Sequence, residues 1–307
     1  MPRQVLIVGG DSEIATATAA HLRAAGVDVA ATTRRPERVA ADRPFLDLAQ
    51  PIADWPIQAG IGAACFCAAI ARLADCARHP EDSARVNVAA TTGLADRLVA
   101  SGIPVLFLST DKVFDGSRPH LPAETPPCPV SEYGRQKAAA EAALAERMAA
   151  GKPVAVLRLA KVVSPGMPLL SQWMASLAAG EPVRAFFDMM MAPTPVGIVA
   201  TAIERLLAEP ARGIFQLTGP RDIAYSEVAA YLARKLGAEA ELVRPVSAYS
   251  AGLPPGSTAP HTTLDSSALR RRFGIAVPEP WEVIDELIET GRHGALAAAS
   301  RHQQAQR

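Results

Sequence analysis

Short apolar runs alternate with helical patterns along the first half of the chain. Apolar residues fill positions 5–8, and two glycines then precede a stretch, 14–22, whose apolar residues recur at helical spacing. Further apolar runs that predict strands lie at 27–31, 45–46, 63–68, 105–109 and 154–159. Helices are predicted over 82–100 and 132–149. Apolar strands joined by crossover segments predict a parallel, doubly wound α/β sheet.

The pattern changes after Ser164. Prolines interrupt the chain at 165, 168, 182, 193 and 195, and proline breaks helix interiors and central strands. Helices are predicted over 169–179 and 225–236, and a strand over 214–217. We therefore expect a Rossmann-like, NAD(P)-binding domain over 1–164 and a smaller, interleaved substrate-binding lobe over 165–290, which can share strands with the first. The segment 291–307 is poor in large apolar residues and is predicted to be a disordered tail.

Composition excludes several classes of function. The 307-residue chain is 49% hydrophobic and 20% charged, which suffices for a large buried core. Lys and Arg total 31 and Asp and Glu total 31, so no net charge attracts nucleic acid or an anionic membrane. Neither a membrane-spanning apolar run nor a signal-peptide pattern occurs, which favours a cytoplasmic protein. Because the 4 cysteines and 6 histidines lack metal-ligand spacing, no metal site is predicted.

The glycine turn after the first strand is the candidate phosphate cradle. A helix that begins at such a turn presents free N–H groups and a partial positive charge to a pyrophosphate. The turn reads VGGDSEIA, with Gly9 in the first place of a glycine pattern and the small residues Ser12 and Ala15 in the next two. A plain strand-to-helix turn is the alternative. Candidate cofactor contacts in this turn are Gly9, Asp11, Ser12 and Ile14.

Positive side chains follow the second strand. An acidic residue there would bind the ribose 2′-hydroxyl of NAD, whereas Thr33, Arg34 and Arg35 suit the 2′-phosphate of NADP. NADP(H) is therefore predicted in preference to NAD(H), the alternative being solvated surface arginines. Four residues at later strand ends are predicted to line the cofactor: Asp47, Leu48, Ala68 and Ala69.

A tyrosine and a lysine lie four residues apart on the predicted helix 132–149. The phenol of Tyr133 and the ammonium of Lys137 then share one helix face. A neighbouring ammonium stabilises the phenolate and moves the pKa of the tyrosine toward the working pH, so Tyr133 can protonate a forming alkoxide. Thr110 ends a strand at the edge where doubly wound sheets place ligands, and its hydroxyl can hold a carbonyl. These three residues are the predicted catalytic groups.

Together the motifs resemble the extended short-chain dehydrogenase/reductase family, and within it the dTDP-4-dehydrorhamnose reductases that act on nucleotide sugars. The matching segments are VLIVGGDSEIA, RVNVAAT, STDKVFDG, YGRQKAAAE, VLRLAKVVS and FDMMMAPTPV. This resemblance implies an NADPH-dependent reductase of a keto group on a nucleotide-linked 4-keto-6-deoxyhexose, with the proton from Tyr133. It also implies that Lys137 binds the nicotinamide ribose and that a homodimer forms through helices of the first domain.

Other roles are implied by position. Asn87 matches an asparagine that supports the lysine through water, and three residues are implied to contact substrate: Asp111, Lys161 and Asp188. Two alternatives remain open. One is a non-catalytic NADP-binding regulatory protein of the same fold, similar to the regulatory subunit of methionine adenosyltransferase. The other is a nucleotide-sugar epimerase or dehydratase, although the dehydratases commonly carry an Asp–Glu pair where this chain has Asp111 and Lys112.

Overall fold

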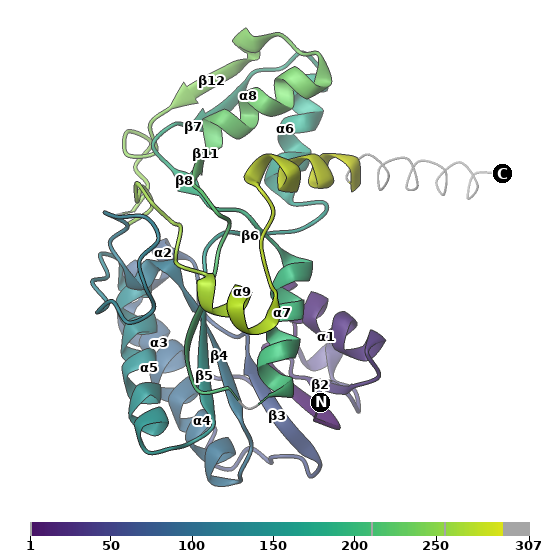
Figure 1. Ribbon diagram of the computed structural model, residues 1–307, viewed down its shortest axis with the longest axis vertical. Coiled ribbons are helices and arrows are strands. Elements are labelled where there is room, and N and C mark those ends of the chain that lie inside the picture. Colours follow the sequence, from purple (N-terminus) through teal and green to yellow (C-terminus); the bar gives the residue numbers. More distant parts are fainter. Residues whose placement is uncertain (1, 210, 255, 291–307) are drawn as a thin grey trace, which may run out of the picture.

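The computed structural model describes residues 2–209, 211–254 and 256–290. The predicted tail, 291–307, lies outside these residues. Two lobes are stacked along the long axis of the molecule, a larger sheet-and-helix lobe and a smaller one above it (Figure 1). The chain passes from the larger lobe to the smaller and returns more than once, so segments far apart in sequence lie side by side in both.

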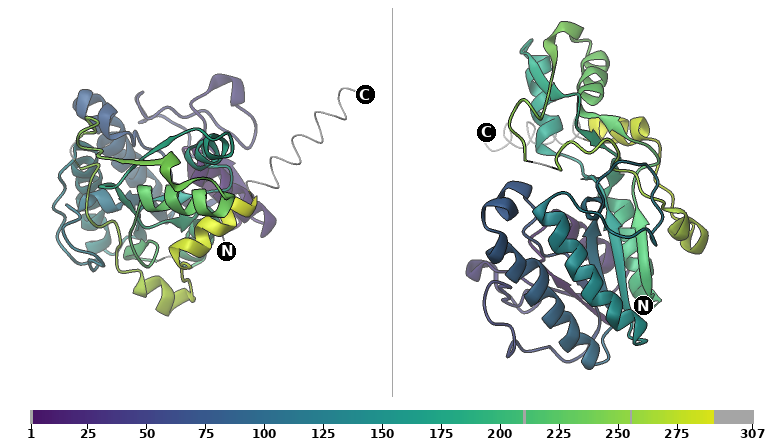
Figure 2. Two further views of the ribbon diagram at one scale, coloured as in Figure 1. Left: turned by 90° about the horizontal axis from the view of Figure 1, so that it is seen from above. Right: turned by 90° about the vertical axis from the view of Figure 1, so that its left-hand side faces the viewer.

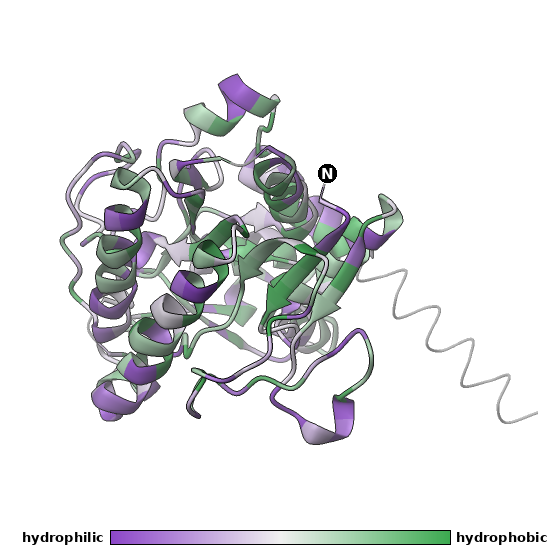
Figure 3. Ribbon diagram, turned by 90° about the horizontal axis from the view of Figure 1, so that it is seen from below, coloured by the Kyte–Doolittle hydropathy of each residue, from purple (hydrophilic) through white to green (hydrophobic). Residues whose placement is uncertain are grey.

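A six-stranded parallel sheet forms the centre of the larger lobe. Its order is β10-β5-β4-β3-β1-β2, and every adjacent pair is parallel. The strands are β1 (Gln4–Val8), β2 (Asp28–Ala31), β3 (Ile61–Phe66), β4 (Val105–Thr110), β5 (Val154–Leu159) and β10 (Gly213–Leu217). Most of their residues are buried because helices cover both faces (Figure 3). The predicted doubly wound α/β fold is therefore confirmed.

Each face of the sheet has its own apolar core. On one face the strands pack against α1 (Glu13–Ala24), α7 (Val196–Ala208) and α9 (Ser267–Phe273). On the other face they pack against α4 (Thr91–Ala100) and α5 (Glu132–Ala149). Short elements connect these layers: η1 (Pro36–Arg38), α2 (Leu73–Arg78), α3 (Pro80–Ala84), the π-helical η2 (Arg85–Ala90) and η3 (Asp111–Val113).

The smaller lobe is built from short paired strands and helices around a third core. Its pairs are β6 (Val162–Val163) with β9 (Thr194–Pro195), β7 (Val183–Phe186) with β12 (Val243–Val246), and β8 (Met190–Met191) with β11 (Ile223–Ala224). Helices α6 (Pro168–Ala178) and α8 (Tyr225–Leu236), the short η4 (Ala240–Leu242) and helical residues 280–290 complete it (Figure 2). Two of these short strands contain a proline, Pro195 in β9 and Pro245 in β12, at positions that a central strand would not tolerate.

Two sequence-based expectations need correction. The strand expected at 45–46 is a single bridge between Phe45 and Thr33, because the Asp47 carboxylate accepts a hydrogen bond from the Ala49 N–H and turns the chain away. The helix expected over 82–100 is three consecutive elements, α3, η2 and α4, with a π-helical turn in the middle. The strand expected near 214–217 is confirmed, and it extends the sheet of the larger lobe beside β5.

A buried ion pair joins β5, the strand beside the edge strand β10, to α5. Arg158 on β5 and Glu141 on α5 are 1% and 3% exposed, with a 2.7 Å separation between Nη2 and Oε2. Arg158 also donates to the Ala123 carbonyl and to the Gln216 side chain on β10. Because removal of one partner would leave a buried charge, the pair fixes α5 relative to β5 and β10. No helix in the described part of the chain is long and apolar enough to cross a membrane.

Candidate active site

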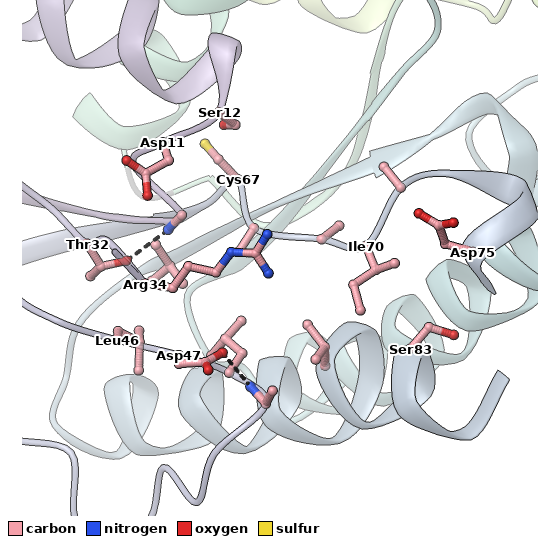
Figure 4. A pocket seen from close by; sticks show the side chains of 18 of the residues that line it. Asp11, Ser12, Thr32, Arg34, Leu46, Asp47, Cys67, Ile70, Asp75 and Ser83 are labelled. Carbon is pink, nitrogen blue, oxygen red and sulfur yellow. Dashed lines mark hydrogen bonds between the residues drawn. The ribbon is translucent and has the colours of Figure 1, made fainter. Parts of the chain in front are cut away.

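A pocket of about 820 Å³ opens at the carboxyl edge of the sheet. It lies between the turn after β1, the ends of β2 and β3, and the segment of α2 and α3 (Figure 4). Its volume falls within the usual range of small-molecule sites, and its place is the one that doubly wound sheets use for ligands. Nine of the predicted cofactor residues line it: Gly9, Asp11, Ser12, Arg34, Arg35, Asp47, Leu48, Ala68 and Ala69.

The first glycine is required by the close approach of β1 to β3. Gly9 has a φ of +87°, and a Cβ there would lie 2.6 Å from the Ala68 Cα. Its N–H donates to the Thr32 hydroxyl at 2.9 Å. Ser12, which stands in the second glycine position, is the N-cap of α1, and its Oγ accepts from the Ala15 N–H. The turn therefore keeps an open cradle at a helix N-terminus, the geometry that suits a pyrophosphate.

Arginines surround the acidic residue of this turn. The Asp11 carboxylate accepts from the Thr33 hydroxyl at 2.7 Å and pairs with Arg43 at 2.7 Å and Arg38 at 3.3 Å. Burial opposes ionisation of Asp11, but the Thr33 hydroxyl and the two guanidinium groups outweigh it, so its pKa is lowered. Thr33 thus acts through Asp11 and is not among the residues that line the pocket.

Arg34 projects its guanidinium into the pocket (Figure 4). Together with Arg35 and the two arginines paired to Asp11, it makes this end of the pocket positive, as a phosphate would require. Arg38 and Arg43 were not predicted from the sequence. The signal available was a cluster of arginines in a short segment, 34–43, without a helical pattern.

Besides Thr33, three predicted cofactor residues do not line the pocket: Ile14, Asn87 and Lys137. Ile14 is half-buried and packs against the core between the sheet and α1. The amide of Asn87 bonds to both main-chain groups of Ile70, from N–H to Oδ1 at 2.8 Å and from Nδ2 to the carbonyl at 2.9 Å. The Nδ2 also donates to Gln136 at 2.8 Å. Support of Lys137 by Asn87, implied by the resemblance, stays a prediction.

Thr110 ends β4 and begins a short turn. Its hydroxyl is mostly buried, donates to the Asp111 carboxylate at 3.0 Å and accepts from the Lys112 N–H at 3.2 Å. Lys112 in turn pairs with Asp111 through Nζ and Oδ2 at 3.3 Å. The hydroxyl therefore lies at the carboxyl end of a central strand, and it can hold a substrate carbonyl once its proton rotates from Asp111 to the carbonyl oxygen.

Helix α5 begins directly against this turn. Ser131 caps it by accepting from the Gly134 N–H at 3.1 Å. A Cβ at Gly134 would collide with the carbonyl oxygen of Lys112. Glycine therefore permits the first turn of α5 to pack on the backbone that follows Thr110, and this contact brings Tyr133 to the same end of the sheet.

Tyr133 is held in its neutral form. Burial raises the pKa of its phenol, and the carboxylate of Asp111 and the thiol of Cys76 raise it further. Lys137 is not among the groups that set this pKa in the arrangement observed, so its expected lowering of the Tyr133 pKa stays a prediction. The Lys137 ammonium instead donates to the Leu108 carbonyl at 2.5 Å and lies 3.7 Å above the centre of the Phe107 ring. A neutral phenol is nevertheless the form that can donate a proton.

Lys137 is 2% exposed. Burial lowers the pKa of its ammonium to about 7, against the opposing effects of Glu141 and Cys67. Lys137 lies on the same face of α5 as Tyr133. A buried lysine with a strongly lowered pKa is typical of functional sites, whereas surface lysines keep their ordinary pKa.

The three implied substrate residues have different surroundings. Asp111 lies beside Thr110, as described. Lys161 follows β5, and burial lowers its pKa, although the Glu13 carboxylate opposes this. Asp188 lies in the smaller lobe, where it accepts from the Ser247 hydroxyl at 2.6 Å and the Ala248 N–H at 2.7 Å, and these bonds lower its pKa. Asp188 therefore holds the turn at 247–250, and the substrate roles of all three stay predictions.

The fold and this site define a class. The chain has a doubly wound sheet with a glycine turn at a helix N-terminus. It also has a Tyr-x-x-x-Lys helix packed against a strand that ends in a threonine. These are the features of NAD(P)-dependent oxidoreductases of the extended short-chain dehydrogenase/reductase type. The chain belongs to the family described as RmlD substrate binding domain, whose model matches residues 3–292.

Sequence and structure comparisons with individual proteins are consistent with membership of this family. The chain is 31% identical over 223 residues to the probable low-salt glycan biosynthesis reductase Agl14 of Haloferax volcanii, covering 69% of this chain and 72% of that protein. It is 28% identical over 221 residues to dTDP-4-dehydrorhamnose reductase of Sinorhizobium fredii, covering 66% and 71%. The crystal structure of dTDP-4-dehydrorhamnose reductase from Bacillus anthracis in complex with NADP has the same fold, with a TM-score of 0.75, 17% identity and coverage of 94% and 98%.

Proposed function

We propose that the protein reduces a keto group on a nucleotide-linked sugar, of the 4-keto-6-deoxyhexose type, with NADPH as the hydride donor. The main support for the proposal is the contact of the first turn of α5 with the backbone after Thr110. This contact brings Tyr133, whose phenol is neutral, to the end of β4 where the Thr110 hydroxyl lies. The name of the Sinorhizobium fredii relative supports the substrate class.

Each proposed catalytic residue has a separate task. Bound NADPH supplies the hydride. The Thr110 hydroxyl orients the keto oxygen, and Tyr133 donates its proton to that oxygen as charge develops there. The Lys137 ammonium then stabilises the phenolate that remains, a state in which its charge is favoured over the neutral amine. The glycine cradle and the arginine-lined end of the pocket would hold the dinucleotide.

The catalytic proposal is tested by mixing the purified protein with NADPH and a panel of 4-keto nucleotide sugars and following loss of NADPH absorbance. Tyr133→Phe is expected to lower the rate roughly 10²- to 10⁴-fold, because general acid catalysis contributes about that much, while NADPH binding is unchanged. Product formation without net NADPH loss would favour an epimerase or a dehydratase. NADPH binding with no turnover of any sugar would favour the regulatory protein.

Preference for NADP(H) is proposed to rest on Arg34 and Arg35. We expect the double substitution Arg34→Ser and Arg35→Ser to weaken NADPH binding by about tenfold or more, the usual contribution of charge-assisted hydrogen bonds. NADH binding should change little, because NADH carries no 2′-phosphate. Isothermal titration with both cofactors measures this. The control is Arg244→Ser, which removes an exposed arginine of β12; equal losses for NADH and NADPH in the double variant would contradict the assignment.

A further inference from the structure

One buried amide on α5 lies between the two proposed catalytic side chains. Gln136 directly precedes Lys137 and follows Tyr133 by three residues, and it is 3% exposed. Its side chain is directed away from solvent and into the segment that contains α3 and η2. Carboxamides are costly to bury unless both their ends are hydrogen-bonded, so the partners of Gln136 are informative.

The hydrogen bonds fix the orientation of two amides in series. Asn87 must direct Oδ1 to the Ile70 N–H and Nδ2 to the Ile70 carbonyl. The remaining Nδ2 hydrogen donates to Gln136 Oε1 at 2.8 Å. Gln136 Nε2 is thereby directed to the Ser83 hydroxyl at 2.8 Å, with the Pro80 carbonyl and the Glu132 carboxylate each at 3.1 Å. The connection runs from Ile70 through Asn87 and Gln136 to Ser83.

Both ends of this connection are walls of the dinucleotide pocket. Ile70 and Ser83 line the cavity, on the loop after β3 and on α3 respectively, and Figure 4 shows them at the same end of it. Asn87 reaches Ile70 and Gln136 together from a π-helical turn, η2. Such turns insert an extra residue into a helix and are frequent at functional sites. The same side chains that shape the pocket wall therefore hold the helix of Tyr133 and Lys137.

We propose that Gln136 is a positioning residue that couples occupation of the dinucleotide pocket to the placement of Tyr133 and Lys137. A dinucleotide that packs on Ile70 and Ser83 fixes Asn87 and Gln136, and Gln136 fixes the first turn of α5. This inference rests on the catalytic roles proposed for Tyr133 and Lys137. A displacement of about 1 Å at reacting groups can lower a rate roughly a hundredfold, so such a contact can set kcat without touching substrate.

Hydrogen exchange of the whole protein, with and without NADPH as the probe, tests the coupling independently of turnover. In the unsubstituted protein NADPH is expected to slow amide exchange both at the glycine turn, 9–15, and at the first turn of α5, 132–138. In Gln136→Ala the slowing at 9–15 should remain, and that at 132–138 should be lost. Ser83→Ala removes one of the two pocket ends of the connection and should weaken the slowing at 132–138, while the path through Ile70 and Asn87 keeps part of it.

The matched control is Leu144→Ala on the same helix. Leu144 is 1% exposed and packs on the sheet two turns beyond Lys137, so its truncation lowers stability without touching the amides. NADPH should still slow exchange at 132–138 in this variant. Retention of that slowing in Gln136→Ala, its loss in Leu144→Ala, or its absence in the unsubstituted protein would each overturn the coupling.

Kinetics supply a second readout where a sugar substrate is found. Gln136→Ala is expected to lower kcat roughly tenfold to a hundredfold while the KM for NADPH changes little, whereas a merely destabilised protein would keep both. Gln136→Glu should recover activity as the pH falls, because a protonated carboxyl again donates to Ser83. If NADPH slows exchange at 132–138 through Gln136 but no nucleotide sugar is reduced, the proposed reaction is wrong and the coupling stands.

Discussion

Burial of the Lys137 ammonium, which the proposed function requires, lowers the stability of the folded protein. Its ammonium is 2% exposed and has the Leu108 carbonyl and the Phe107 ring as partners, and burial lowers its pKa from 10.5 to about 7. Below pH 7 the group is charged in both the folded and the unfolded chain, so the whole cost of burying the charge opposes folding. Between about pH 7 and 10.5 the folded protein has already released the proton, and the cost declines as the pH rises.

Lys137→Met should therefore stabilise the protein most at low pH. The thioether fills the same slot without a charge, and the gain in free energy of unfolding is expected to be on the order of a few kcal/mol at pH 6 and to shrink toward pH 10. Thermal melts of both proteins across this range measure it, with reductase activity lost at every pH. Lys152→Met, at an exposed lysine, is the control and should show no such trend. A Tm difference that grows with pH would refute the assigned cost.

At the scale of residues, sequence spacing predicted what lies at strand ends and on one helix face. Thr110, Tyr133 and Lys137 follow from the periodicity of β4 and α5, and Gly9 follows from the turn between β1 and α1. Contacts between distant side chains could not be predicted in this way. Arg43 and Asp11 pair although 32 residues separate them in sequence, and Gln136 bonds to Ser83 across 53 residues. Both contacts depend on loops whose path no local sequence pattern predicts.

Among the elements, the first turn of α5 depends on a glycine, in addition to the apolar face that packs the helix on the sheet. Glycine inside a helix normally costs about 1 kcal/mol relative to alanine, so Gly→Ala at an open helix site is stabilising. Gly134 is an exception because a Cβ there would meet the Lys112 carbonyl oxygen. Gly134→Ala is expected to lower Tm and to reduce kcat roughly a hundredfold, since α5 must shift away from Thr110.

A second helical glycine provides the control for this effect of Gly→Ala on stability, which is expected to be destabilising at Gly134 and stabilising at an open site. Gly93 lies in α4, where a Cβ would meet only the Ile52 Cδ1 at 3.7 Å, an ordinary contact. Gly93→Ala should raise the free energy of unfolding by roughly 0.5–1 kcal/mol and leave kcat unchanged. Melts and steady-state rates of the two variants measured together decide the point. If Gly134→Ala proved as stable and active as Gly93→Ala, the close packing of α5 on the turn after Thr110 would be refuted.

Long periodic elements were predicted well and short ones poorly. The bounds of α5 and α8 agree with the ranges expected from their patterns. The π-helical turn over Arg85–Ala90 was invisible, because its extra residue is stabilised by Asn87 bonding to Ile70, a contact outside the helix. The two-residue strands β6, β8, β9 and β11 have too few positions to show an alternation. Each pairs with a strand that is distant in the sequence, which no local pattern can show.

For the molecule as a whole, the larger lobe is completed by residues from the second half of the chain. Helix α7 contributes Val199, Ile203 and Leu206 to the core that α1 covers, and β10 contributes Phe215 and Leu217. Strand β10 also pairs with β5 along its full length. The division at residue 164 that the proline pattern suggested is therefore crossed by the core itself, although the smaller lobe has a core of its own.

This crossing predicts that residues 1–164 do not fold alone. The fragment would expose the face of α1 that α7 covers and the hydrogen-bonding edge of β5 that β10 covers, and unpaired apolar edges favour aggregation over folding. Burial of Arg158 would also lose Gln216 as a partner. We expect the fragment to show no cooperative thermal transition by circular dichroism and no NADPH binding, whereas the full chain shows both. A cooperative melt of the fragment would contradict this prediction. It would mean that residue 164 is a true folding boundary and that the larger lobe is stable without α7 and β10.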